Sequence, residues 1–167
     1  MSSETLTSVH LQRYEIISSR PFDDVVRAIR AGLGHPDFAA LVRKLPTLTD
    51  WTGFQAEVAA NVGEAGLMVF MELDLGAVVA LDPQAHPFKA IRIIAGNPVT
   101  MESMVRSTPG AGVFAPVTIL IFESSDGVHI RYDSLSSAVG HELTDDSAPY
   151  ALALDEEVLN LIREAGD

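Results

Sequence analysis

Three charged residues, Glu72, Asp74 and Arg92, form the most suggestive group in the sequence for binding or proton transfer. Glu72 and Asp74 are two positions apart in an alternating apolar stretch, which places both on one face of a strand. Two close carboxylates can raise one another's pKa or bind a hard cation. Arg92 lies in the apolar run Ile91–Ala95, where an unpaired buried charge is costly. We therefore expect Arg92 to pair with Glu72 or Asp74, or to hold an anionic ligand.

The turn Gly96-Asn97-Pro98 is a second candidate, because it leads from a predicted strand into a predicted helix. Glycine and asparagine tolerate backbone conformations that other residues avoid, and proline suits the first helical position. The free N–H groups of a helix N-terminus can hold an anion, which would place Asn97 in a binding cleft. The composition favours the alternative, a structural turn. The polar lining of a pocket would comprise Glu72, Asp74, Arg92 and Asn97.

The five histidines show no metal-ligand spacing, and the chain has no cysteine. Disulfides, thiolate nucleophiles, cysteine zinc sites and iron–sulfur clusters are therefore excluded. His129, in a predicted hairpin strand, is the one histidine retained as a candidate ligand-binding residue. The sequence contains no dinucleotide-binding glycine motif, no P-loop and no G-x-S-x-G elbow. We expect neither a cofactor nor a metal site.

The composition is that of one acidic domain spanning residues 1–167. Hydrophobic residues make up 47% and charged residues 20%, which excludes a disordered chain. The net charge of −12 argues against a nucleic-acid partner, since that needs a basic surface. No apolar stretch approaches the ~20 residues of a membrane-spanning helix, and the first residues lack secretory-signal features. We expect a soluble, cytoplasmic protein without a membrane partner.

The C-terminal segment, residues 142–167, concentrates the negative charge, with eight acidic residues and one basic residue. Its apolar spacing predicts a helix with Val158, Leu161 and Ile162 facing inward and Asp155 as the N-cap. We interpret the acidic surface as solvated, with a docking surface for a basic partner as the alternative.

Hydrophobic periodicity predicts the elements that position these residues. A strand over His10–Ser18 is followed by an amphipathic helix over Pro21–Ala31 with Ser19 as its N-cap. A short helix capped by Asp37 and another capped by Asp50 or Thr49 come next. The stretch Leu67–Leu81 is predicted to be one strand with a bend or bulge at Gly76, or two strands. A strand over Ala90–Ala95 and a helix opening at Pro98 or Thr100 follow. The last predicted pair of strands is a hairpin of Thr118–Glu123 and Val128–Tyr132 around Asp126-Gly127.

This order of elements favours an α+β two-layer sandwich, with a mainly antiparallel sheet and helices packed on one face. The other face of such a sheet needs cover, and a homodimer would supply it.

The segment Glu72–Asp133 carries a specific series: the stretch Glu72–Gly76, the strand and turn Lys89–Pro98, the loop Pro109–Pro116 and the hairpin. This series resembles family 302 of the domains of unknown function, and residues 10–135 fit it overall. The resemblance implies a small α+β sandwich that forms dimers, and it implies no reaction. Members often carry a histidine where this chain has Leu75, so a metal or acid–base role of that histidine does not transfer.

Two functional hypotheses remain open. The first is a dimeric module that binds a small ligand or a protein and has no catalytic set. Its partners would be a second copy of the chain and a small anionic or metal ligand. The alternative is an enzyme that uses Glu72 or Asp74 as acid or base in a pocket with Arg92 and Asn97.

Overall fold

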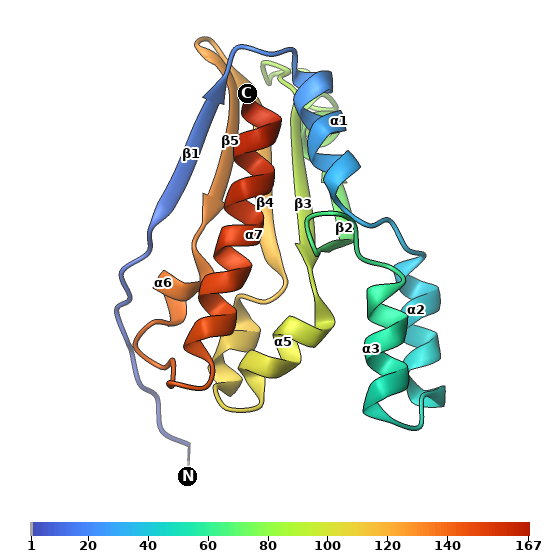
Figure 1. Ribbon diagram of the computed structural model, residues 1–167. Coiled ribbons are helices and arrows are strands. Elements are labelled where there is room, and N and C mark those ends of the chain that lie inside the picture. The colour runs from blue at the N-terminus through green and yellow to red at the C-terminus, as the bar shows by residue number, and fades with distance from the viewer. Residues whose placement is uncertain (1) are drawn as a thin grey trace.

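The computed structural model describes residues 2–167, and an open five-stranded antiparallel sheet forms its centre (Figure 1). The strands lie in the order β1-β5-β4-β3-β2. Their bounds are β1 Arg13–Ser18, β2 Met68–Asp74, β3 Ala90–Gly96, β4 Val117–Ser124 and β5 Gly127–Asp133. The helices are α1 Phe22–Gly32, α2 Phe38–Lys44, α3 Trp51–Ala59, α4 Leu75–Val79, α5 Pro98–Val105, α6 Leu135–Val139 and α7 Ala148–Gly166, with 3-10 turns at Leu45–Thr47 and Pro109–Val113.

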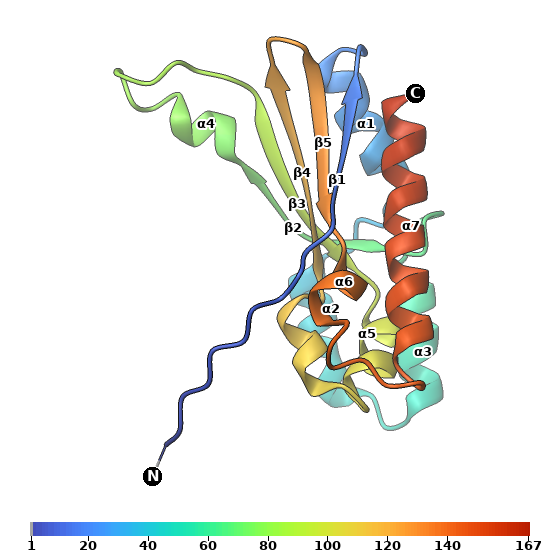
Figure 2. The same cartoon turned by 90° about the vertical axis from the view of Figure 1, so that its left-hand side faces the viewer.

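Helices α1 and α7 lie against one face of the sheet, and Figure 2 shows the sheet edge-on with both helices on the same side. The register explains this. Ile121 pairs with Ile130 on β5 and with Ile91 on β3, so one face carries a row of isoleucines. Val25 and Ile29 of α1 and Ile162 of α7 are buried over that face. The predicted α+β sandwich with an antiparallel sheet is therefore confirmed. Within residues 2–167, no helix has both the length and the apolar content that crossing a membrane requires.

Several predicted helix starts are confirmed. The Asp37 carboxylate accepts a hydrogen bond from the Ala40 N–H at 2.9 Å, and α2 begins at the next residue. Asp50 caps α3 in the same way. The prediction for Ser19 is wrong, because α1 begins after Pro21 and has no side-chain cap.

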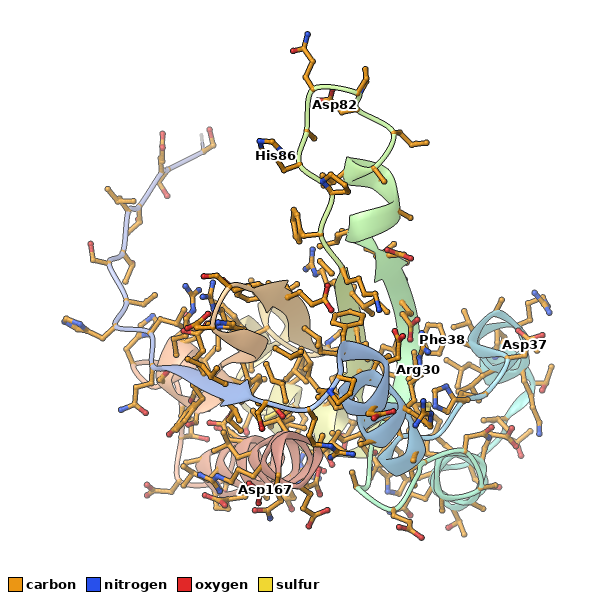
Figure 3. All side chains as sticks on the ribbon, turned by 90° about the horizontal axis from the view of Figure 1, so that it is seen from above. Arg30, Asp37, Phe38, Asp82, His86 and Asp167 are labelled. Carbon is orange, nitrogen blue, oxygen red and sulfur yellow. The ribbon has the colours of Figure 1, made fainter. Side chains whose placement is uncertain are left out.

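The predicted strand over Leu67–Leu81 is wrong in its second half. Strand β2 ends at Asp74, whose carboxylate accepts a hydrogen bond from the Ala77 N–H at 2.8 Å and so begins α4. A local helix cap thus overrides the apolar continuation of the strand. We call residues 75–89 the arm. It projects from the sheet on the side away from α1 and α7, with Asp82 and His86 near its tip (Figures 2 and 3).

The prediction that Asp155 caps the last helix is also wrong. Helix α7 begins at Ala148, and Asp155 lies seven residues further along, 6% exposed and facing the sheet. Its carboxylate accepts hydrogen bonds from the Tyr132 hydroxyl at 2.5 Å and from the Ser134 hydroxyl at 2.7 Å. The backbone N–H groups of Leu135 and Ser136 and the Ser136 hydroxyl donate as well. Asp155 therefore fastens α7 to the end of β5 and the start of α6.

Burial, together with the hydrogen bond to Asp155, raises the pKa of Tyr132 well above its usual range. Its hydroxyl therefore keeps its proton and acts as a donor to the carboxylate.

Candidate functional site

The two predicted carboxylates of β2 both lie on the helix side of the sheet, but they have separate partners. Glu72 forms an ion pair with Arg30 of α1, whose Nε and Nη2 each donate a hydrogen bond to one oxygen of the carboxylate. This contact raises the pKa of Arg30. Asp74 is occupied as the cap of α4. The structure thus gives each carboxylate a positioning contact, and it does not join the two in one cavity.

Arg92 lies on the opposite face of the sheet, so the expected pairing with Glu72 or Asp74 is wrong. In the register, Arg92 stands opposite Leu73, and directly opposed residues share a face. Within residues 2–167, its side chain makes one hydrogen bond, a weak one from Nη2 to the Thr118 hydroxyl at 3.4 Å. Among residues 2–167, no carboxylate lies within ion-pair distance of Arg92. Arg92 is thus an arginine without a counter-charge on the open face.

Asn97 caps helix α5 and uses all of its side-chain polar groups. Its Oδ1 accepts hydrogen bonds from the N–H groups of Val99 at 2.9 Å and Thr100 at 3.4 Å. Its Nδ2 donates to the Gly66 carbonyl at 2.9 Å. Since Pro98 has no N–H, the first turn of α5 keeps no free donor for an anion.

His129 lies on the open face of the sheet between two carboxylates. Its Nδ1 is 3.0 Å from Glu15 and its Nε2 is 2.8 Å from Asp126. The ring stacks on Phe122 at 4.8 Å between centroids, and Arg131 shares the Glu15 carboxylate. The contacts with Asp126 and then Glu15 raise the pKa of His129, while the hydrogen bond with His129 lowers the pKa of Asp126.

We predict that this cluster makes stability depend on pH near neutrality. Because the folded chain raises the pKa of His129, its contribution is fully present below its unfolded pKa of about 6.5 and is lost as the pH rises through the folded value. The free energy of unfolding should therefore fall above about pH 6.5 in a urea titration series. Glu15 and Asp126 affect stability in a separate, acidic pH range. Folding lowers the pKa of each carboxylate, so its contribution to stability is lost only as the pH falls through that lowered pKa.

The matched control for this prediction is the exposed histidine of the arm. The His129→Gln variant should lack the decrease above neutrality, and His86→Gln should retain it. A His129→Gln variant with the pH dependence of the unmodified chain would refute the assignment.

The open face of the sheet forms a continuous surface around Arg92 and His129. One row runs across all five strands through directly paired positions: Glu15, Arg131, Leu120, Arg92 and Leu73. A hollow of about 560 Å³ lies at one end of this face. Its lining includes Leu11, Arg13, Arg92, Phe114, Leu120 and Arg131. The structure therefore brings two predicted residues, Arg92 and His129, to one face, and it leaves Glu72, Asp74 and Asn97 away from it.

Across residues 2–167, no group of three histidine or carboxylate side chains is arranged to hold a metal ion. Sequence reasoning missed the Arg30–Glu72 pair and the contact of His129 with Glu15 because both join residues more than 40 positions apart. The contact of His129 with Asp126, only three positions away, was also missed. The alternation of Arg13 and Glu15 with Tyr14 and Ile16 was the one available signal, since it marks an outward-facing charged edge of β1.

Comparison with known proteins supplies the family. The chain matches the model of the family described as "Domain of unknown function DUF302" over residues 43–165. The chain belongs to this family. The matched stretch of this DUF302 domain includes α7, whereas the sequence resemblance was drawn over about residues 10–135.

One solved structure is similar to this DUF302 domain over nearly its whole length. It carries the description "Crystal structure of uncharacterized conserved protein DUF302 from Bacillus stearothermophilus" and aligns with a TM-score of 0.63. The alignment covers 93% of this chain and 98% of that chain at 9% identity, so the likeness concerns the fold alone. No curated protein matches the chain.

Proposed function

We propose that this DUF302 domain is a protein-interaction module that pairs with a second copy of itself through the open face of its sheet. The observation that carries the proposal is the apolar content of that face. Ile17 is 54% exposed and Met71 is 51% exposed, while Leu120 and Phe122 between them are half-buried. Antiparallel sheets that face water normally carry polar residues outward, and large exposed apolar patches mark interaction surfaces.

The size of the surface supports a second copy as the partner. Five strands about 4.8 Å apart, each with about six residues at about 3.3 Å, give a face of roughly 500 Å² in projection. Stable interfaces bury about 800 Å² per partner. The arm extends the surface on the same side of the sheet and exposes Val78, Leu81 and Phe88. The face and arm together approach the area that a stable dimer needs.

The charge on this face also suits pairing. The whole chain carries −12, but on the open face three arginines, Arg13, Arg92 and Arg131, balance three carboxylates, Glu15, Asp126 and Asp133. Two of those arginines are neutralised within the chain, by Asp133 and by Glu15. The open face is therefore close to neutral although the whole chain is strongly acidic, so two copies meet there with little charge repulsion.

Binding of a small anionic ligand is a second candidate function, because Arg92 lines the hollow and lacks a counter-charge. A metal ligand and an acid–base enzyme centred on Glu72 or Asp74 gain no such support. Both carboxylates are already held, one by an arginine and one by a helix N-terminus.

The test of pairing is the mass in solution of the unmodified chain and of two variants that each place an arginine on the open face. The unmodified chain should sediment at twice its 17.9 kDa, because each copy covers the other's apolar rows. Leu120→Arg and Ile17→Arg should each weaken the dimer at least about tenfold, since each buries a charge without a partner (about 1.4 kcal/mol or more).

The matched control is Leu152→Arg, at a leucine that is 57% exposed on the outer side of α7. It should leave the mass at the dimer value, and circular dichroism should report the folded state of each variant. Folded open-face variants that stay dimeric, or an unmodified chain that sediments as a monomer, would overturn the proposal. Calorimetric titration with inorganic phosphate tests the second candidate, a small anionic ligand. That candidate requires a heat of binding in the unmodified chain that is absent in Arg92→Gln.

A further inference from the structure

We propose that this domain has a second, separate binding site, a pocket between α2, α3 and α5 that takes a small neutral aromatic molecule. The pocket has a volume of about 190 Å³, and Asn97 is the one candidate residue from the sequence that lines it. Its main walls are Phe38, Leu41, Phe54, Phe70, Met101 and Pro116. The inference does not depend on pairing through the open face.

The pocket offers no polar anchor. Asn97 is the one residue of the lining with a polar side chain, and each of its polar groups is already hydrogen-bonded to the backbone. A charged or strongly polar ligand would lose its hydration without gaining a hydrogen bond. The chemistry of the walls therefore selects a neutral, apolar occupant.

The size of the pocket limits the occupant to about one ring. A cavity of about 150 Å³ lined by leucine, isoleucine and phenylalanine stays dry and binds benzene. The pocket here is about 190 Å³, so a single ring with one or two methyl groups fits it.

The shape of the walls favours a flat ring over a chain. Phe38 of α2 and Phe70 of β2 are stacked with centroids 4.4 Å apart and ring planes at 16°. Phe54 adds a third aromatic side chain to the lining, and the rings of Pro98 and Pro116 also belong to it. Aromatic rings interact best through offset-stacked or edge-to-face contacts, which a planar ligand can make with several of these walls at once.

The mouth of the pocket is also apolar. Val42 is 46% exposed and Leu45 is 38% exposed, and both belong to the lining. The helices that carry them pack through a small core of their own around Leu41, Val58 and Met68, apart from the main core. A ligand would join this small core to α5 and remove apolar surface from water.

The probe for the test is p-xylene, with the unmodified full-length chain. At ten times its Kd, p-xylene should raise the Tm by about 3–5 °C, because the ligand stabilises only the folded state. The single tryptophan gives a second readout. Trp51 stacks on Phe54 with centroids 5.2 Å apart, so binding in the pocket should change its fluorescence.

Two valine-to-tryptophan variants locate the site. Val42→Trp fills the pocket from its mouth and should abolish the Tm shift, whereas Val78→Trp, in the exposed arm, should retain it. Since Val42 is half in solvent, the variant is expected to fold, and Leu45→Trp provides a second filling variant.

Three results would overturn the proposal: no Tm shift or fluorescence change in the unmodified chain, an equal shift in the filled and control variants, or an equal shift with cyclohexane. The first result would show that the chain has no such site. The second would show that p-xylene binds elsewhere, and the third would show that the site does not prefer an aromatic ring.

Discussion

Asp155→Ala is expected to lower the free energy of unfolding by about 3–5 kcal/mol, a large part of the stability of a domain this size. The carboxylate is 6% exposed and accepts hydrogen bonds from the side chains of Tyr132, Ser134 and Ser136 and from two backbone N–H groups. Alanine would leave these donors buried without an acceptor. Because the network joins α7, α6 and β5, its loss also loosens α7 from the sheet.

Urea denaturation followed by circular dichroism measures this effect. The control is Glu156→Ala, which removes the same charge from the neighbouring, exposed position of α7. We expect that control to change stability by no more than about 0.5 kcal/mol. Asp155→Asn, which keeps the shape but loses the charge, should fall between the two. Equal stability of Asp155→Ala and Glu156→Ala would show that the network contributes nothing net.

Gly34→Ala is expected to destabilise the chain by about 3 kcal/mol or more, because there is no room for a methyl group. An added Cβ would lie 1.9 Å from the carbonyl oxygen of Asn61. The backbone cannot move away easily, since the Gly34 N–H donates to Leu67 and its carbonyl accepts from Val69, both at the start of β2. This close approach sets how the α2–α3 pair sits beside β2, and so it also shapes the apolar pocket.

Gly53 in α3 provides a control, because its substitution by alanine is expected to change the free energy of unfolding in the opposite direction. An added Cβ at Gly53 meets nothing closer than 3.5 Å, and alanine is a better helix former than glycine. Gly53→Ala should therefore raise the free energy of unfolding by about 0.5–1 kcal/mol. The account of Gly34 would be contradicted if the two alanine variants shifted the urea midpoint in the same direction.

Local signals in the sequence predicted most of the fold. The caps Asp37 and Asp50, the Gly96-Asn97-Pro98 turn and the Asp126-Gly127 hairpin depend on residues within a few positions of each other, and the structure has each of them. The strand over Leu67–Leu81 failed because its apolar pattern continues past Asp74, where a helix cap begins α4.

The candidate site was harder to predict because its contacts join distant parts of the chain. Strand alternation correctly placed Glu72 and Asp74 on one face, but the register that puts Arg92 on the other face depends on the pairing of β2 with β3. The prediction of Asp155 as a cap is wrong, because this carboxylate lies in the interior, which acidic residues usually avoid. Its position among Ala151, Val158 and Ile162 on the buried stripe of α7 was the available sign of a buried carboxylate.

The central claim is that a second copy covers the open face, and the oxidation rate of Met71 tests it most directly. Met71 is 51% exposed on that face, whereas Met68 and Met104 are fully buried and serve as internal references. Hydrogen peroxide converts an accessible methionine to its sulfoxide, which mass spectrometry quantifies. We predict that Met71 in the unmodified chain oxidises at least about tenfold more slowly than in Leu120→Arg that is folded and sediments as a monomer, a ratio that corresponds to about 1.4 kcal/mol of protection. Equal rates in the two proteins would show that the face is open to solvent and would contradict the claim.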